Sequence, residues 1–263
     1  MGKPLIPAQR RERIQGYLAT RQIARIADLC ALLDASDATV RRDLEWMEDE
    51  GLLERTHGGA ILSRRLISEP EYLQRVNKNP DEKKWIGALA ASLIGDGDIV
   101  FINSGTTTTQ VIRHIRPNAD ISVFTNNLNA ALEIGEAGFQ HHLLGGEYQP
   151  VSKSSAGRFA IENLRQIYAD ICIIGVDGIS LKHGCTVPVN AEAEVVRAMV
   201  ERTKGRIVIV ADHSKWGVVS NFPVATIDEV DVLVTDEKFD PSAIEELAGH
   251  EVETVVAGRQ VDR

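Results

Sequence analysis

A run of small and hydroxyl-bearing residues follows an apolar segment in the middle of the chain. The apolar segment, Ile99–Ile102, has the composition of a buried strand, and residues 103–109 after it read Asn-Ser-Gly-Thr-Thr-Thr-Thr. A turn of this kind exposes backbone N–H groups, its hydroxyls add donors, and the N-terminus of a following helix adds partial positive charge. These groups suit a phosphate, although the Gly-Lys-Ser/Thr pattern of a Walker loop is absent. A threonine-rich helix cap without a ligand would show the same residues.

Residues of the same kind follow four further apolar segments. The four groups are Thr125-Asn126-Asn127, Gly145-Gly146-Glu147, Gly175-Val176-Asp177-Gly178 and Asp212-His213-Ser214-Lys215. Ligands of parallel sheets bind beyond the carboxyl ends of the strands, so these groups are expected to converge. Small residues, amides, a carboxylate and a lysine on one rim indicate a pocket for a phosphorylated polyol. Glu192, at the start of a predicted helix, is a further candidate, whereas Lys215 could equally form an ordinary surface ion pair with an aspartate.

The elements that would position these groups alternate from residue 81 onward. Apolar strands are predicted at residues 99–102, 121–124, 142–144, 170–175, 206–211, 230–235 and 252–256. Helices are predicted at residues 82–93, 107–115, 130–135, 158–167, 191–203 and 242–248. Continuous apolar strands separated by helices are typical of a parallel sheet that is covered on both faces. We therefore predict a mostly parallel α/β domain in this part of the chain.

Two short apolar stripes near the start of the chain predict a helix-turn-helix. The stripes are Ile26, Leu29, Cys30 and Leu33, followed by Val40, Leu44 and Met47. Their spacing fits two helices, and Ser36 between them is expected to cap the second helix with its side chain. An earlier helix near residues 10–19, with Ile14 and Leu18 inward, would complete a three-helix core.

The second of these helices carries the residues that could touch DNA. Thr39 and Arg42 lie opposite its apolar stripe and Arg41 lies on its flank, in the first turns, where recognition helices contact bases and phosphates. The acidic Glu45 and Glu48 fall in later turns, so the helix should enter the groove with its N-terminus first. Arg41 and Arg42 could also be no more than a solvated face.

The segment after this helix has the pattern of a wing. Gly51 fits a helix stop, and residues 52–61 predict a small hairpin with a glycine turn. Arg55 and His57 on this hairpin could reach the DNA backbone or the minor groove.

Two segments with this order and spacing resemble the DNA-binding domain of the DeoR-type bacterial repressors. They are Ala38-Thr39-Val40-Arg41-Arg42-Asp43-Leu44 and Gly51-Leu52-Leu53-Glu54-Arg55-Thr56-His57-Gly58-Gly59-Ala60. The resemblance implies a winged helix-turn-helix whose partner is double-stranded operator DNA. The predicted DNA-binding residues are Ser36, Thr39, Arg41, Arg42, Arg55 and His57.

The later part of the chain resembles the sensor domain of the same regulators, which is similar in fold to ribose-5-phosphate isomerase. The resemblance rests on residues 104–108, 125–128, 145–147, 175–178 and 212–215. It implies that the loop 104–108 holds the phosphate of a sugar-phosphate effector and that Asp177, Glu192 and Lys215 face the sugar. The predicted effector-binding residues are Ser104, Gly105, Thr106, Thr107, Thr108, Asn126, Gly146, Asp177, Glu192 and Lys215. Asn103, where the family commonly has aspartate, and Val196, where it often has lysine, leave the particular sugar open.

The charge of the chain is distributed unevenly. The net charge of −9 would argue against DNA binding, but residues 1–65 hold 11 basic and 10 acidic residues, while the remainder holds 18 and 28. Almost all of the acidity therefore lies outside the predicted DNA-binding part, where a local basic patch can still bind phosphates.

Three ranges describe the predicted organisation: a winged helix-turn-helix at 1–62, a linker at 63–80, and a domain for effector sensing and oligomerisation at 81–263. The linker could contain a short helix near Tyr72. No apolar run of about 18 residues and no signal peptide are found, so we expect a cytoplasmic protein without a membrane partner. Cys30, Cys172 and Cys185 form no C-x-x-C pair and are expected to be reduced thiols.

The expected function is repression of a carbohydrate-catabolism operon that a phosphorylated sugar relieves, without a cofactor. Paired half-sites require two recognition helices about 34 Å apart, which implies a homodimer or homotetramer. Two alternatives remain. Glu192 or Asp177 could serve as the base of a sugar-phosphate isomerase. A metal-dependent or redox regulator is disfavoured, because the adjacent His141 and His142 point to opposite faces of a strand, although Cys185 in a loop could be reactive.

Overall fold

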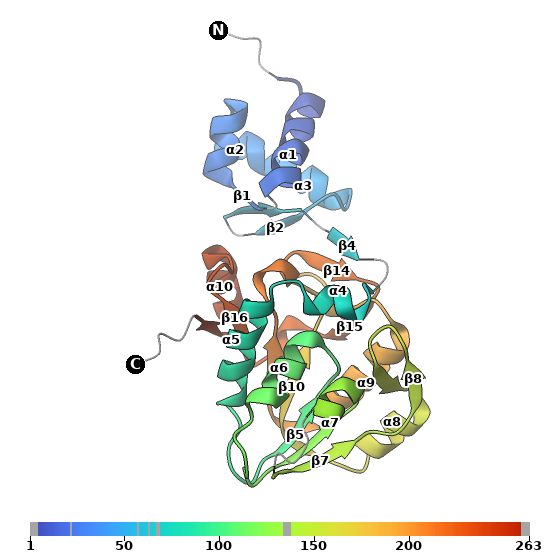
Figure 1. Cartoon of the computed structure of the whole chain (residues 1–263). Coiled ribbons are helices and arrows are strands. Elements are labelled where there is room, and N and C mark those ends of the chain that lie inside the picture. The colour runs from blue at the N-terminus through green and yellow to red at the C-terminus, as the bar shows by residue number, and fades with distance from the viewer. Residues whose placement is uncertain are drawn as a thin grey trace. The chain divides into compact units, whose positions relative to one another are not determined.

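The computed structural model describes residues 5–21, 23–56, 58–62, 64–66, 69–133 and 138–258. The chain divides into two compact units, residues 1–65 (unit 1) and residues 66–263 (unit 2), each with its own hydrophobic core (Figure 1). Within the described ranges, no helix is long and apolar enough to cross a membrane.

Unit 1 contains three helices and a small antiparallel sheet. The helices are α1 (Pro7–Arg21), α2 (Ile26–Leu33) and α3 (Asp37–Asp49), and the strands are β1 (Ile23–Arg25), β2 (Glu54–Thr56) and β3 (Gly59–Ile61), in the order β1-β3-β2. The predicted apolar stripes meet in the core, where Ile14, Leu18, Leu29, Val40, Leu44 and Met47 are buried. The predicted helix-turn-helix and its hairpin are confirmed.

Two details of unit 1 differ from the prediction. Strand β1 was not expected, and it approaches β3 so closely that a Cβ on Gly59 would lie 1.9 Å from the carbonyl oxygen of Ala24. Ser36 is at the N-cap position of α3, but its side chain accepts no bond from the N–H groups of the helix. Its hydroxyl instead hydrogen-bonds the Thr39 hydroxyl at 2.9 Å. The predicted side-chain cap is therefore wrong, and only the Ser36 carbonyl caps the helix, accepting from the N–H of Thr39.

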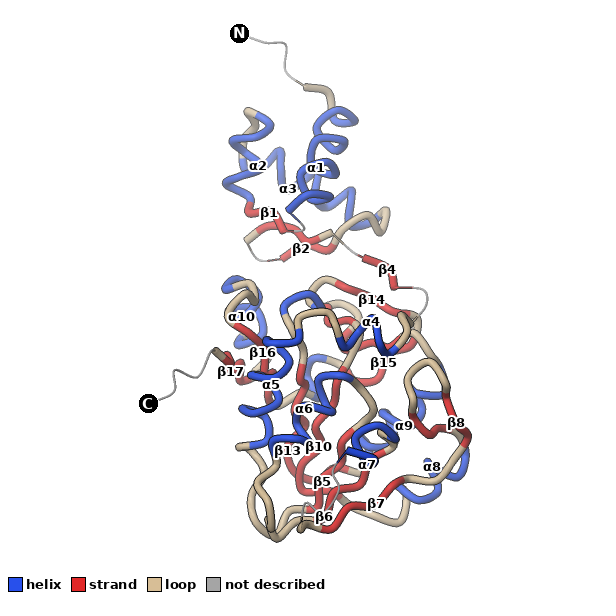
Figure 2. Tube along the Cα trace, viewed as in Figure 1, coloured by secondary structure: helices blue, strands red, loops and turns tan. Residues whose placement is uncertain are grey.

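In the described part of unit 2, seven strands form one parallel sheet (Figure 2). In spatial order they are β17 (Glu253–Ala257), β16 (Val232–Asp236), β13 (Thr203–Val210), β10 (Ala169–Gly175), β5 (Ile99–Ile102), β6 (Ser122–Thr125) and β7 (Gln140–Leu143). The predicted helices appear as α5 (Pro80–Ala91), α6 (Thr106–His114), α7 (Leu128–Glu133), α8 (Arg158–Leu164), α9 (Asn190–Glu201) and α10 (Pro241–Ala248). The predicted parallel α/β architecture is confirmed.

The alternating side chains of the central strands explain why helices cover both faces of the sheet. On one face, Val100 and Ile102 of β5 join a cluster that includes Ile86 of α5 and Val111 of α6. Phe101 points to the opposite face, is also fully buried, and lies on the side where α9 packs against β10 and β13. Such double burial requires the continuous apolar runs that identified the strands.

Several short elements of unit 2 were not predicted. They are β8 (Glu147–Gln149), β9 (Ser154–Ala156), β11 (Gly178–Ser180), β12 (Gly184–Val187), β14 (Val218–Ser220), β15 (Phe222–Ala225) and the 3₁₀ turns His213–Lys215 and Ile227–Glu229. The short helix considered near Tyr72 is present as α4 (Tyr72–Val76). The stretch 63–80 also differs from a plain linker, because it carries β4 (Arg64–Leu66) and α4. Tyr72 of α4 is buried, and its hydroxyl lies 3.4 Å from the Thr109 hydroxyl of α6. Part of the expected linker is thus packed into unit 2.

Candidate functional site

Two asparagines fix the loop that follows β5. Asn103 donates from its side chain to the Gly175 carbonyl at 2.9 Å and accepts from the Gly175 N–H at 2.8 Å, so it ties β5 to β10. Asn126, after β6, accepts from the Ser104 N–H at 2.8 Å and donates to the Ser155 carbonyl at 2.9 Å. An ionised aspartate at position 103 could not donate to the Gly175 carbonyl. The amide at this position therefore holds two strand ends together.

Helix α6 begins directly after this loop, with Gly105 at its N-cap. The hydroxyls of Thr108 and Thr109 donate back to the Gly105 carbonyl at 3.1 and 2.7 Å. The first N–H groups of any helix have no partner within it. Here that turn forms part of a pocket wall together with Ser104 and Thr106. The N–H groups and the partial positive charge of the helix end provide a seat for a phosphate-sized anion.

A pocket of unit 2 opens in front of this loop. Its lining comprises Ser104, Gly105, Thr106 and Thr107 of the loop and α6, the strand-end residues Asn103, Asn126, Gly175, Val176, Asp177 and Asp212, and Arg75, Lys78, Lys83, Val187, Glu192, Val196 and Lys215. Most of these side chains are polar or charged. The pocket thus combines an anion seat with carboxylates and cations that can hydrogen-bond hydroxyl groups.

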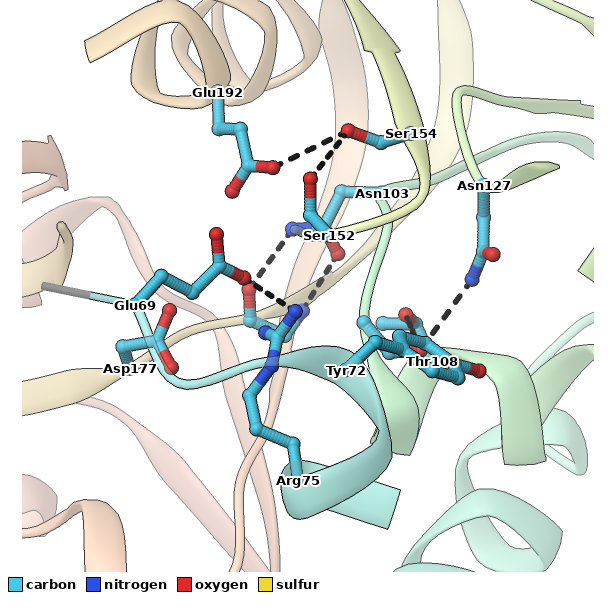
Figure 3. Close-up of polar contacts among 12 residues, drawn as sticks. Glu69, Tyr72, Arg75, Asn103, Thr108, Asn127, Ser152, Ser154, Asp177 and Glu192 are labelled. Atoms are coloured by element: carbon cyan, nitrogen blue, oxygen red, sulfur yellow. Dashed lines mark hydrogen bonds and ion pairs between the residues drawn. The ribbon is translucent and has the colours of Figure 1, made fainter. Parts of the chain in front are cut away.

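The carboxylates of Glu69, Asp177 and Glu192 lie near one another and near the Arg75 guanidinium (Figure 3). The Lys215 ammonium lies 3.1 Å from a carboxylate oxygen of Asp177, and Arg75 forms an ion pair with Glu69. Burial raises the pKa of Glu192 above its usual range. Burial, together with the charge of Glu192, also raises the pKa of Glu69 to about 8. Glu69 and Glu192 therefore hold a proton more readily than exposed glutamates, because burial disfavours their charged forms.

Lys83 supplies a further cation from α5. Its buried ammonium donates to the carbonyl of Arg75 and, at 2.6 Å, to the carbonyl of Lys78. Burial lowers the pKa of Lys83 to about 8. An anion bound in the pocket would favour the charged form of this ammonium. The α4–α5 segment thus contributes basic groups to a pocket whose loop lies further along the chain.

Eight of the ten predicted effector-binding residues line this pocket: Ser104, Gly105, Thr106, Thr107, Asn126, Asp177, Glu192 and Lys215. The other two, Thr108 and Gly146, are not part of its lining. Thr108 is fully buried, and its hydroxyl is used by the Gly105 carbonyl. Gly146 allows its backbone to pack closely against that of Ala156, because a Cβ at position 146 would lie 2.3 Å from the Ala156 carbonyl oxygen.

Sequence reasoning missed the basic residues Arg75, Lys78 and Lys83. Lys83 did carry a signal, since it precedes Ile86 and Ala90 by three and seven residues and therefore shares the buried face of α5. A lysine on such a face needs a partner. Arg75 and Lys78 gave no comparable signal, because their stretch has little periodicity.

The first turns of α3 present the predicted DNA-binding residues. Arg41 and Arg42 are both exposed, and Arg41 forms an ion pair at 2.6 Å with Asp37, one turn earlier. Thr39 is partly exposed and shares its hydroxyl with Ser36. Together these residues form a polar face at the N-terminal end of α3, opposite its buried stripe. This is the part of a recognition helix that meets base edges and phosphates.

Other basic residues of unit 1 are engaged inside it. Arg10 donates to the buried Asp43 at 2.5 Å, which ties α1 to α3. Arg55 of β2 lies 3.9 Å from the Glu48 carboxylate, which also accepts from the Arg55 N–H at 2.9 Å. His57 lies outside the described residues. Arg41 is ion-paired as well, but its side chain is 50% exposed against 36% for Arg55.

The metal and redox alternatives gain no support from the geometry. Within the residues that the structure describes, no group of His, Cys, Asp and Glu could hold a metal ion. Cys185 was expected in a loop, but it lies within β12 and is buried. Burial raises the pKa values of the Cys172 and Cys185 thiols to about 12. The placement of Cys185 in a loop was therefore wrong, and the possibility that its thiol is reactive gains no support.

Comparisons with known proteins agree with this arrangement. The DeoR-like helix-turn-helix domain matches residues 10–65, and the DeoR C terminal sensor domain matches residues 78–237. The HTH-type transcriptional regulator GlpR of Haloferax volcanii is 33% identical over 254 residues, covering 97% of this chain and 99% of that protein. The HTH-type transcriptional repressor GlcR of Bacillus subtilis is 37% identical over 209 residues, covering 79% and 80%. The transcriptional repressor AccR of Agrobacterium fabrum is 35% identical over 232 residues, covering 86% and 88%.

Among solved structures, ribose 5-phosphate isomerase A of Methanocaldococcus jannaschii is similar to part of the chain. The identity is 14% and the TM-score 0.40, with 53% of this chain and 55% of the isomerase covered, so the match spans about half of the enzyme. This likeness is too low to indicate function. The sequence relatives above are regulators and repressors rather than enzymes. The chain belongs to the DeoR family of transcriptional regulators, with a DeoR-like helix-turn-helix domain followed by a DeoR C terminal sensor domain.

Proposed function

We propose that this regulator represses a carbohydrate-catabolism operon and that a phosphorylated sugar, bound in unit 2, releases it from its operator. The observation that carries the proposal is the anion seat at the start of α6, which opens into a pocket lined by carboxylates and lysines. Two of the relatives are themselves named repressors.

The phosphate and the sugar of the effector would contact different groups of the pocket. The phosphate would lie on the N–H groups of the loop 104–107 and accept from the Thr107 hydroxyl, with the Lys83 ammonium as a further cation. Hydroxyl groups of the sugar would donate to Asp177 and Glu192 and accept from Lys215. A free sugar would lack the phosphate contacts, and inorganic phosphate would lack the hydroxyl contacts.

The DNA-binding function would be performed by α3. Thr39, Arg41 and Arg42 would enter the major groove, and two copies of the chain would place two such helices about 34 Å apart. A sugar phosphate that binds more tightly to the arrangement incompatible with DNA would lower the DNA affinity, with a coupling free energy of about 1–3 kcal/mol. We infer a homodimer or homotetramer on this ground.

A thermal-shift experiment on the full chain tests the effector class. Ribose 5-phosphate, fructose 1-phosphate and glucose 6-phosphate are each compared with the corresponding free sugar and with inorganic phosphate. A specific ligand stabilises the folded state by mass action, so at least one sugar phosphate should raise the Tm more than either control. The Thr107→Val variant should lose most of that shift. If no phosphorylated compound raises the Tm, or if free sugars do so equally, the proposal is wrong.

A further inference from the structure

Glu69 and Arg75, close to the start of unit 2, form an ion pair at the edge of the pocket. We propose that Arg75 is an effector-binding residue and that Glu69 occupies its guanidinium in the absence of effector, so that the sugar phosphate and Glu69 exchange places. This inference rests on the proposed function. It adds Arg75 and Glu69, neither of which was among the predicted effector-binding residues.

Arg75 has the geometry of a ligand-binding group. It lines the pocket from the last turn of α4, its side chain is 13% exposed, and its N–H donates to the Glu71 carbonyl at 3.1 Å, which fixes the backbone. Among the described residues, its buried Nε has no hydrogen-bond partner. A guanidinium offers five N–H donors in a planar fork that fits the oxygens of a carboxylate or a phosphate, and it can hydrogen-bond sugar hydroxyls as well. The Glu69 carboxylate uses only part of that capacity.

The Glu69 carboxylate is destabilised where it pairs with Arg75, because it is buried close to other carboxylates. Its side chain is 2% exposed, and it shares the region with the carboxylates of Asp177 and Glu192 (Figure 3). The Lys215 ammonium is already paired with Asp177 at 3.1 Å. At Glu69, the charges of Glu192 and Asp177 oppose those of Arg75 and Lys215, and like charges in a buried site destabilise one another. A neutral hydroxyl that replaced Glu69 at the guanidinium would relieve this repulsion.

Because of the position of Glu69, the exchange would affect the chain segment that follows unit 1. Glu69 lies just after the boundary between the two units, which falls at residue 65. The segment that follows Glu69 also contacts the pocket-lining residue Lys83, whose ammonium donates to the carbonyls of Arg75 and Lys78. Release of Glu69 would therefore remove one of the contacts that hold the start of unit 2, where β4 also pairs with β14. A local charge exchange is a known way to bias a two-state element.

Calorimetric titration of the full chain tests the exchange. The probes are ribose 5-phosphate, fructose 1-phosphate, glucose 6-phosphate and inorganic phosphate, at about pH 8.5, where Glu69 carries its charge. With the sugar phosphate that binds, Glu69→Gln should tighten binding about three- to tenfold, and Arg75→Gln should weaken it about tenfold or more. In the Arg75→Gln background, Glu69→Gln should have no further effect. Glu162→Gln, which removes an exposed carboxylate on α8, is the matched control and should change nothing.

Each other outcome rejects the exchange. If wild type binds a sugar phosphate and Glu69→Gln binds it equally or more weakly, Glu69 has only a structural role. If Glu69→Gln tightens binding equally in the Arg75→Gln background, Glu69 does not act through Arg75. Arg75→Lys, which keeps the charge, provides the same cycle should the glutamine variant fail to fold. If no probe binds the wild type, the proposed function fails together with the exchange, whereas the first two outcomes leave it intact.

Discussion

Replacing Glu69 with glutamine should change how the stability of unit 2 depends on pH. Burial is the main cause that raises the pKa of Glu69 from 4.5 to about 8, followed by the charge of Glu192, with Asp177 acting in the same direction. Arg75 and Lys215 lower this pKa and offset only part of the rise. These four side chains are the charged groups with the largest effects on the pKa of Glu69.

The sign of the effect follows from proton binding. Between about pH 4.5 and pH 8 the folded state keeps a proton on Glu69 that the unfolded chain has already lost, so the free energy of unfolding falls as the pH rises through this window. One pKa unit corresponds to about 1.4 kcal/mol, which makes the full loss on the order of 4 kcal/mol near pH 8. Glutamine carries no such proton. The Glu69→Gln variant should therefore match wild type near pH 5 and be more stable near pH 8.

Urea denaturation at several pH values measures this difference. The fluorescence of Trp85 and Trp216 reports on unit 2, and the comparison stays below about pH 8, because Lys83, whose pKa is lowered to about 8, titrates above it. The exposed Glu162→Gln variant should keep the pH dependence of the wild type. Equal slopes for wild type and Glu69→Gln across the window would refute the assignment of a raised pKa to Glu69.

Three further predictions concern other parts of the chain. Arg42→Ala should weaken DNA binding about tenfold in fluorescence anisotropy and leave effector binding intact; an unchanged DNA affinity would argue against α3 as the recognition helix. Lys215→Ala should retain DNA binding but weaken sugar-phosphate binding about tenfold in calorimetry, and normal binding would remove Lys215 from the site. Gly59→Ala places a Cβ 1.9 Å from the Ala24 carbonyl oxygen and should destabilise unit 1 by about 2 kcal/mol or more in thermal unfolding, a loss that a wild-type Tm would disprove.

The sequence was most informative where burial on two faces forces a continuous apolar run. Ile99–Ile102 was read as a strand because of such a run, and the asparagine after it marked the point where the strand meets the loop. The apolar stripes of α2 and α3 were recognisable for the same reason, since their buried residues recur at helical spacing.

The sequence was least informative where short elements depend on tertiary contacts. Helix α4 has five residues, too few for a periodic pattern, and it is held by Tyr72, Lys83 and the Arg75–Glu69 pair rather than by its own propensity. Strand β1 forms because Gly59 allows a close approach from β3. Arg75 and Lys78 were missed for this reason, because they lie on or next to this short helix, whereas Lys83 lies on the predicted helix α5.

The central claim is that sugar-phosphate binding in unit 2 lowers the affinity of unit 1 for DNA. Its most direct test is fluorescence anisotropy of the full chain bound to a labelled DNA fragment selected for tight binding, titrated with the sugar phosphate that raises the Tm. The account predicts that the DNA is released by the wild type but retained by Thr107→Val, which binds the same DNA. Retention of DNA by the wild type at a ligand concentration that saturates its pocket would contradict the account.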